Sequence, residues 1–220
     1  REAFELAPLN PLNTANMLWW YWEKAKYTNA AAYAEILRNG TPDALAGALL
    51  SEFENQLKVQ HFASSDQFET EMIKKVRSRK ASGSRIVVVS DLSVIGCPMQ
   101  LSGFECAAAS FLSNCLERKT NIRAVRRTEI RGTAEYLKLP AKAVGEPASL
   151  KQIASALSAD FIVFGEIANY NNGYLMNVRI AGAESGEIFA VASERASSYE
   201  ELAPALDKAA SIFLEALPAK

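Results

Sequence analysis

The side chains best suited to nucleophilic or metal chemistry are those of His61, Cys97, Cys106 and Cys115. A zinc site made from them would lack the closely spaced pair of cysteines found in structural zinc sites. A thiol nucleophile would need a base beside it, and the chain contains no histidine after His61. We therefore expect no catalytic residue and no metal ligand among these side chains.

A phosphate-binding loop would be expected in "LSVIGCPMQLSG", residues 92–103, because this segment follows an apolar run that predicts a strand. Gly96 and Gly103 are widely separated there, and no G-x-x-x-x-G-K-[ST] motif occurs. Asp91, just before the segment, is a lone carboxylate, which is more typical of a turn or helix cap than of an acid. We expect no nucleotide or other cofactor, and we predict that the protein is not an enzyme.

Two basic clusters have alternative interpretations. They consist of Lys74, Lys75, Arg77, Arg79 and Lys80, and of Arg118, Lys119, Arg123, Arg126, Arg127 and Arg131. They could contact anionic lipid headgroups, a glycan or an acidic partner. A solvated surface balanced by acidic residues is the interpretation we favour. The formal net charge of −1 and the absence of interleaved aromatic residues argue against nucleic acid as a partner.

The segment "LWWYW" concentrates aromatic residues in an unusual way. On a helix, Trp19, Trp20 and Tyr21 would point around most of the circumference, and Trp22 would add a further direction. Either several elements surround this helix, or part of it contacts another protein or a membrane surface. We predict that residues 13–60 form an interaction module in which these four residues contact a partner.

The first 80 residues have the pattern of a helical segment. Residues 42–60 carry an apolar stripe at helical spacing, with Thr41 as the expected cap and Pro42 at the first position. A helix or helix pair precedes them and ends at Asn39-Gly40. A more polar helix over 64–78 and a linker over 80–85 follow. We predict a helical interaction segment over 1–80 and a separate domain over 85–217.

From Arg85 onward, strand and helix patterns alternate. "RIVVVSD" predicts a buried strand, residues 104–116 a helix, and "TNIRAVRR" a short strand. "SLKQIASALSAD" predicts a helix with a capping box from Ser149 to Gln152. Two tight turns then separate strands near 160–168, 173–182 and 187–195, which we expect to be antiparallel neighbours, before a last helix with a capping box from Ser198 to Glu201. The fold class is α/β: a mixed sheet with helices over at least one face.

The three cysteines allow two states, three reduced thiols or one disulfide plus one free thiol. On the predicted helix over 104–116, Cys106 and Cys115 would be roughly 13 Å apart along the axis and on opposite faces. Any disulfide within the chain must therefore use Cys97.

Residues 85–197 resemble a known family. The features are a helix ending at Leu157–Asp160, "G-x-I" at Gly165–Ile167, "V-R-I" at Val178–Ile180 and "S-G-E-I" at Ser185–Ile188. This pattern is similar to the TolB amino-terminal-domain-like family, which includes FlgO-like envelope lipoproteins. It covers about half of the chain and contains no catalytic motif. The cysteine-containing loop and the helical first part depart from the family.

The resemblance implies a non-catalytic scaffold of the periplasm or outer membrane, as part of a flagellar or secretion machine. Other envelope proteins or a second copy would be its partners, and an anchor removed from the N-terminus would allow peripheral membrane association. The alternative is an extracytoplasmic ligand-sensing domain of a signalling protein. In an exported protein we predict a Cys97–Cys106 disulfide, because Cys106 lies off the predicted apolar stripe, with Cys115 reduced in the core.

Overall fold

The structure is a computed structural model that describes residues 11–24, 26–59, 74, 78, 83–96, 104–119, 121–140 and 144–218. Most of the predicted helix over 64–78, most of the first basic cluster and the boundary near residue 80 lie outside the described residues, as do His61 and Cys97.

The first part of the chain contains α2 (Pro11–Glu23), α3 (Tyr27–Asn39) and α4 (Ala44–Val59). The predicted helix pair is confirmed, and α3 ends where the Asn39-Gly40 signal indicated, with the Gly40 N–H bonded to the carbonyl of Ile36. The cap of α4 is Asp43 rather than Thr41, because the Asp43 carboxylate accepts bonds from the N–H groups of Leu45 and Ala46. Pro42 therefore precedes the helix.

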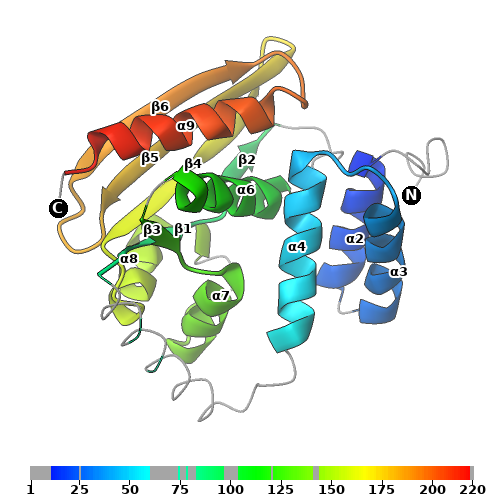
Figure 1. Cartoon of the computed structure of the whole chain (residues 1–220), viewed down its shortest axis with the longest axis horizontal. Coiled ribbons are helices and arrows are strands. Elements are labelled where there is room, and N and C mark those ends of the chain that lie inside the picture. The colour runs from blue at the N-terminus through cyan, green and yellow to red at the C-terminus, as the bar shows by residue number, and fades with distance from the viewer. Residues whose placement is uncertain are drawn as a thin grey trace.

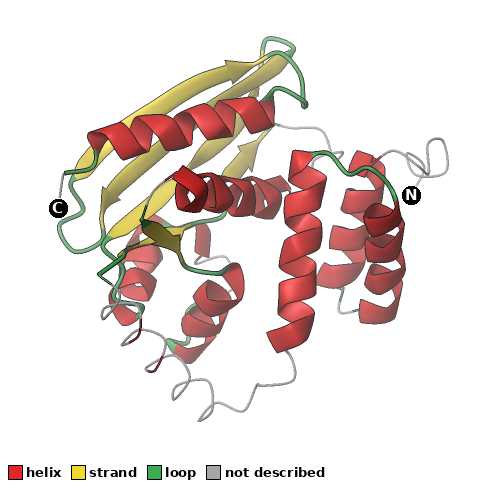
Figure 2. Ribbon diagram, viewed as in Figure 1, coloured by secondary structure: helices red, strands yellow, loops and turns green. Residues whose placement is uncertain are grey.

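The strands form one mixed sheet in the order β3-β1-β4-β5-β6. Its members are β1 (Arg85–Val89), β2 (Ser93–Ile95), β3 (Ile122–Ala124), β4 (Phe161–Tyr170), β5 (Gly173–Gly182) and β6 (Ile188–Ala196). β1 pairs in parallel with β3 and β4, and β2 pairs in parallel with the outer part of β4. The long strands β4, β5 and β6 extend beyond the short β1 and β3 (Figure 2). The sequence did not indicate β2.

The predicted antiparallel neighbours are confirmed as β4, β5 and β6. Asn171 and Asn172 both have positive φ angles, 48° and 61°, between the paired residues Tyr170 and Gly173. This geometry is that of a two-residue type I′ turn, which matches the twist of a hairpin. The register of β4 and β5 is therefore set by local sequence.

Four helices accompany the sheet within the described residues: α6 (Phe104–Lys119), α7 (Arg127–Tyr136), α8 (Pro147–Ala156) and α9 (Leu202–Ala216). The predicted α/β class is confirmed. α7 was not predicted, and the capping box at Ser149 was wrong, because α8 already begins at Pro147. The N-cap of α9 is Glu201 without a side-chain cap bond, so the capping box at Ser198 was wrong as well.

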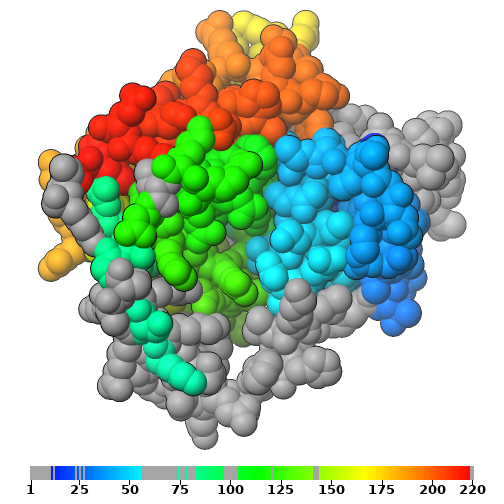
Figure 3. All heavy atoms as spheres, in the orientation of Figure 1, coloured from blue at the N-terminus to red at the C-terminus, as the bar shows by residue number. Residues whose placement is uncertain are grey.

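Helices cover both faces of the sheet at β1. Val87 and Val89 point into a core shared with α6 and α9, whereas Ile86 and Val88 point into a second core shared with α7 and α8. α6 and α9 lie on one side of the sheet, and α4 lies beside α6 with α2 and α3 beyond it (Figure 1). The surfaces of α4 and α6 meet directly (Figure 3). The first core therefore continues from the sheet through α6 into the helical first part.

Candidate functional site

The aromatic cluster in α2 is divided between core and surface. Trp19 and Trp22 are 5% and 4% exposed, and the rings of Trp22 and Phe53 meet edge to face at 5.2 Å. Tyr21 is half-buried and stacks on Tyr33. Trp20 is 46% exposed. For Trp19 and Trp22 the geometry favours the alternative in which several elements surround the helix, and Trp20 is the tryptophan available to a partner.

The described cysteines are both free thiols inside the core. The expectation that Cys106 lies off the apolar side of its helix was wrong, because the sheet, α4 and α9 together bury most of the circumference of α6. Burial raises the pKa of the Cys106 thiol well above its usual range, and raises the pKa of Cys115 to about 11. Both thiols are therefore poor nucleophiles. With Cys97 outside the described residues, the Cys97–Cys106 bridge stays a prediction.

A polar crevice of about 720 Å³ lies where the two parts of the chain meet. Its walls come from α4, α6, the start of α7, the end of β1 at Val89, and residues 121–126 around β3. β1 and β3 are parallel neighbours, and the helices that follow them, α6 and α7, cover opposite faces of the sheet. Such a switch in direction at the carboxyl ends of parallel strands is where open α/β sheets bind ligands.

Three of the charged side chains that line the crevice already have partners. Arg127, which is buried, forms an ion pair with Asp91 at the end of β1. The Glu129 carboxylate accepts a bond from the Arg126 N–H at the start of α7. The Glu117 carboxylate accepts one from the Ala124 N–H at the outer edge of β3. Asp91 therefore holds the start of α7 against the end of β1. This role differs from both roles considered for Asp91 from the sequence, a catalytic acid and a turn or cap residue.

Glu52 of α4 is the exception among the buried acids. It is 8% exposed and lines the crevice, and its Oε2 accepts a long bond of 3.4 Å from the Ser110 hydroxyl. Its Oε1 has no hydrogen-bond partner among the described residues. Burial raises the pKa of this carboxyl, and Arg127 of α7 opposes the increase. The sequence carried a signal for Glu52: it occupies the apolar stripe of α4 between Leu49 and Phe53.

A second candidate surface is the part of the sheet that α7 and α8 leave uncovered. We call it the open sheet face. It consists of Ser93 and Ile95 of β2, Glu166, Ala168 and Tyr170 of β4, Leu175, Asn177 and Arg179 of β5, and Val191, Ser193 and Arg195 of β6. All of these residues are exposed or only half-buried.

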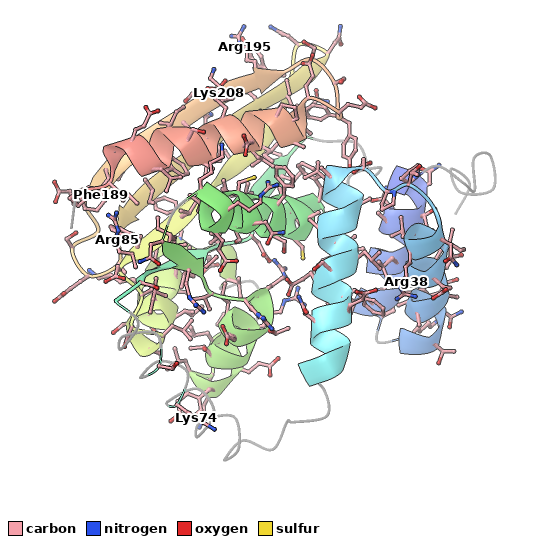
Figure 4. The ribbon with its side chains drawn as sticks, viewed as in Figure 1. Arg38, Lys74, Arg85, Phe189, Arg195 and Lys208 are labelled. Carbon is pink, nitrogen blue, oxygen red and sulfur yellow. The ribbon has the colours of Figure 1, made fainter. Side chains whose placement is uncertain are left out.

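The open sheet face combines apolar side chains with mainly positive charge. Ile95, Tyr170 and Val191 are each about half exposed. Arg195 lies 5.5 Å from the Tyr170 ring and projects from the outer end of β6 (Figure 4). Arg179 and Arg195 outnumber the single carboxylate on this face, Glu166. The mixture of aromatic, apolar and arginine side chains is typical of protein-binding surfaces.

No group of histidine, cysteine, aspartate or glutamate residues within the described ranges is arranged to hold a metal ion. The described helices also include none with the length and apolar character needed to cross a membrane.

No protein-family model matches this sequence, and no curated protein does. Among solved structures, the chain is similar to the C-terminal domain of LpoB from Salmonella enterica, with 13% identity and a TM-score of 0.42 over 52% of this chain and 84% of that one. It is also similar to the C-terminal domain of LpoB from Escherichia coli, with 12% identity and a TM-score of 0.42 over 60% and 98% of the two chains. An NMR structure of E. coli LpoB gives 15% identity and a TM-score of 0.41 over 56% and 63%.

These similarities are too low to carry an argument about function. They do not support the narrower resemblance to the TolB and FlgO-like family, or a link to flagella or secretion. The functional argument therefore rests on the two surfaces described above.

Proposed function

We propose that this protein is a non-catalytic component of the cell envelope that acts by binding another protein. The observation that carries this proposal is the open sheet face. A sheet surface that spans four strands and exposes aromatic and aliphatic side chains is an unusual feature for a surface that contacts only water. The envelope location is proposed from the family resemblance of residues 85–197.

The composition of the open sheet face indicates what kind of protein would bind. Ile95, Tyr170 and Val191 would pack against an apolar strip on the partner. Arg179 forms no ion pair with a described residue, and Arg195 contacts only the Tyr170 ring among them. Both guanidinium groups are therefore available to carboxylates. We infer that the partner presents an apolar strip flanked by acidic side chains.

The absence of catalytic activity is part of the same proposal. It is supported by the raised pKa values of the buried Cys106 and Cys115 thiols, which leave little thiolate near neutral pH. It is also supported by the structural use of Asp91, which pairs with Arg127.

Site-specific photocrosslinking in cells tests the proposal. A photoreactive amino acid at Val191 of the open sheet face should give one discrete adduct with an envelope protein, and Arg195→Glu combined with Arg179→Glu should abolish it. The same amino acid at Lys208, on the exposed side of α9, serves as the matched control and should give no such adduct. Fractionation of the full-length product should place it in the envelope.

Equal adducts from Val191 and Lys208, or an adduct that survives both arginine substitutions, would show that the open sheet face is not the binding surface. Recovery of the full-length product in the cytoplasm would refute the envelope location.

A further inference from the structure

We propose that the polar crevice between α4, α6 and α7 is a binding site for a small anion that carries phosphate or carboxylate oxygens. This inference is independent of the protein-binding role, because the crevice and the open sheet face use different residues. It rests on the position of the crevice, its free cations and one buried acid.

The position is that of a ligand site. The volume of about 720 Å³ is within the usual range of roughly 300–1,000 Å³ for small-molecule sites. The crevice reaches the carboxyl ends of β1 and β3, at the switch point of the sheet. α7 begins at this point, so the positive end of its dipole faces the crevice.

The charged side chains of the crevice that have no ion-pair partner among the described residues include two arginines. Arg123 on β3 and Arg126 at the cap of α7 line the crevice with exposed side chains, and neither guanidinium is ion-paired with a described residue. The nearby acids Glu117 and Glu129 are engaged with backbone N–H groups. An anion placed between the two arginines would therefore gain charge-assisted bonds without displacing an existing ion pair.

Glu52 supplies an independent sign of a ligand. A carboxyl oxygen that is buried without a hydrogen-bond partner is costly, and a ligand that pairs with Glu52 Oε1 would remove this cost. Burial raises the pKa of this carboxyl although Arg127 opposes the increase, so Glu52 binds a proton more readily than an exposed glutamate does. A protonated Glu52 would donate this proton in a hydrogen bond to an oxygen of the ligand.

The ligand is therefore a polar anion with several oxygens, held by two arginines at one end and by Glu52 at the other. Inorganic phosphate and succinate are suitable probes, because they present the same oxygen chemistry from a phosphoryl group and from carboxylates.

The experiment is a titration of the full chain, labelled with ¹⁵N, with each probe in turn. We expect saturable chemical-shift changes at the amides of residues 123–130. Arg126→Gln should weaken binding about tenfold or more, since a hydrogen bond to a charged group contributes about 1.5–3 kcal/mol. Glu52→Gln keeps a donor at the same place and should bind as the parent does, whereas Glu52→Ala should bind less tightly.

Arg179→Gln on the open sheet face is the matched control and should leave the affinity unchanged. Saturation with phosphate alone indicates a phosphorylated ligand, and saturation with succinate alone indicates a carboxylate ligand. The proposal is overturned if neither probe saturates, or if Arg179→Gln weakens binding as much as Arg126→Gln does.

Discussion

The two faces of the sheet differ in how far helices cover them. On one face, α9 packs along β5 and β6 while α6 packs on β1, so the core is continuous from β6 to β1. On the other face, α7 and α8 bury residues of β1 and β4, and the buried residues contributed by β5 and its following turn are only Ala181 and Ala183 among those described. One face of the sheet is thus covered by helices from β1 to β6, whereas the other is covered at β1 and part of β4 and is exposed beyond them.

The difference follows from how the strands are connected. Parallel neighbours require crossovers, and the crossovers from β1 to β3 and from β3 to β4 place α6 on one face and α7 and α8 on the other. The antiparallel strands β5 and β6 are added by short turns, which bring no helix with them. Antiparallel sheets tolerate one solvated face, so the open sheet face is compatible with a stable fold.

The largest effect that distinguishes the faces is expected at Phe213 of α9, which is fully buried on the covered face. Phe213→Ala should lower the free energy of unfolding by about 3–5 kcal/mol, because it removes a large side chain from a packed core. Denaturant unfolding measures this change. A loss below about 1 kcal/mol would mean that α9 is not essential to the core.

The next largest effect is expected at Gly165 of β4, which pairs with Val178 of β5. A Cβ there would clash with the carbonyl oxygen of Asn177, so Gly165→Ala must move the β5 backbone. We expect a loss of about 3 kcal/mol, the upper end of the usual cost of overpacking. Gly47→Ala in α4 is the control: a Cβ there meets no atom within 4 Å, and the substitution should stabilise the helix by about 0.5–1 kcal/mol. Equal effects at both positions would contradict the steric explanation.

Glu52→Gln is expected to have a smaller effect that depends on pH. Because burial raises the pKa of Glu52 in the folded state, its contribution to stability is fully present below the ordinary glutamate pKa and is lost as the pH rises through the folded-state pKa. The glutamine side chain of the variant does not titrate, so the variant should be more stable than the parent at neutral pH, by on the order of 1 kcal/mol. The difference should disappear in acid. Thermal unfolding between about pH 4 and 8 measures it, and a gain that is constant with pH would contradict a raised pKa.

The smallest effect is expected on the open sheet face. Val191→Ser exchanges an exposed side chain on the outermost strand, and should change the free energy of unfolding by no more than about 0.5 kcal/mol. Denaturant unfolding alongside Phe213→Ala gives the direct comparison. A loss of several kcal/mol from Val191→Ser would mean that this face is covered in the folded protein.

The elements with strong local signals could be predicted from sequence. The hairpin of β4 and β5 was predicted from alternating side chains and the Asn171-Asn172-Gly173 turn, and the apolar stripe of α9 predicted its buried face. α7 was missed because "RTEIRGTAEY" is largely polar, and its buried residues include Arg127, Glu129 and Thr133. Inside the protein, these polar side chains are paired through ion pairs and through hydrogen bonds within the helix. A search for apolar residues at helical spacing does not detect a helix of this kind.

The candidate sites were predicted less well than the fold. The sequence identified the arginines of the crevice as part of a basic cluster, and we predicted that this cluster is a solvated surface. That interpretation fits Lys119, whose ammonium group pairs with Asp207 at 2.8 Å, but not the buried Arg127. Glu52 and Asp91 come from opposite parts of the chain, so no local pattern could place them beside the same arginine.

By itself, the sequence determined every strand except β2, the two hairpin turns and the mixed α/β class, because backbone geometry and side-chain alternation depend on neighbouring residues. Only the tertiary structure decided which faces those elements bury. Trp19 is part of the core, and its ring also lies 5.8 Å from the guanidinium groups of Arg127 and Arg131, which are distant in sequence. Trp20, on the same turn, stays at the surface. Whether a side chain is buried depends on which elements, distant in sequence, pack against it in the fold. The cost of burying a polar or charged group depends in turn on the partners that this packing supplies.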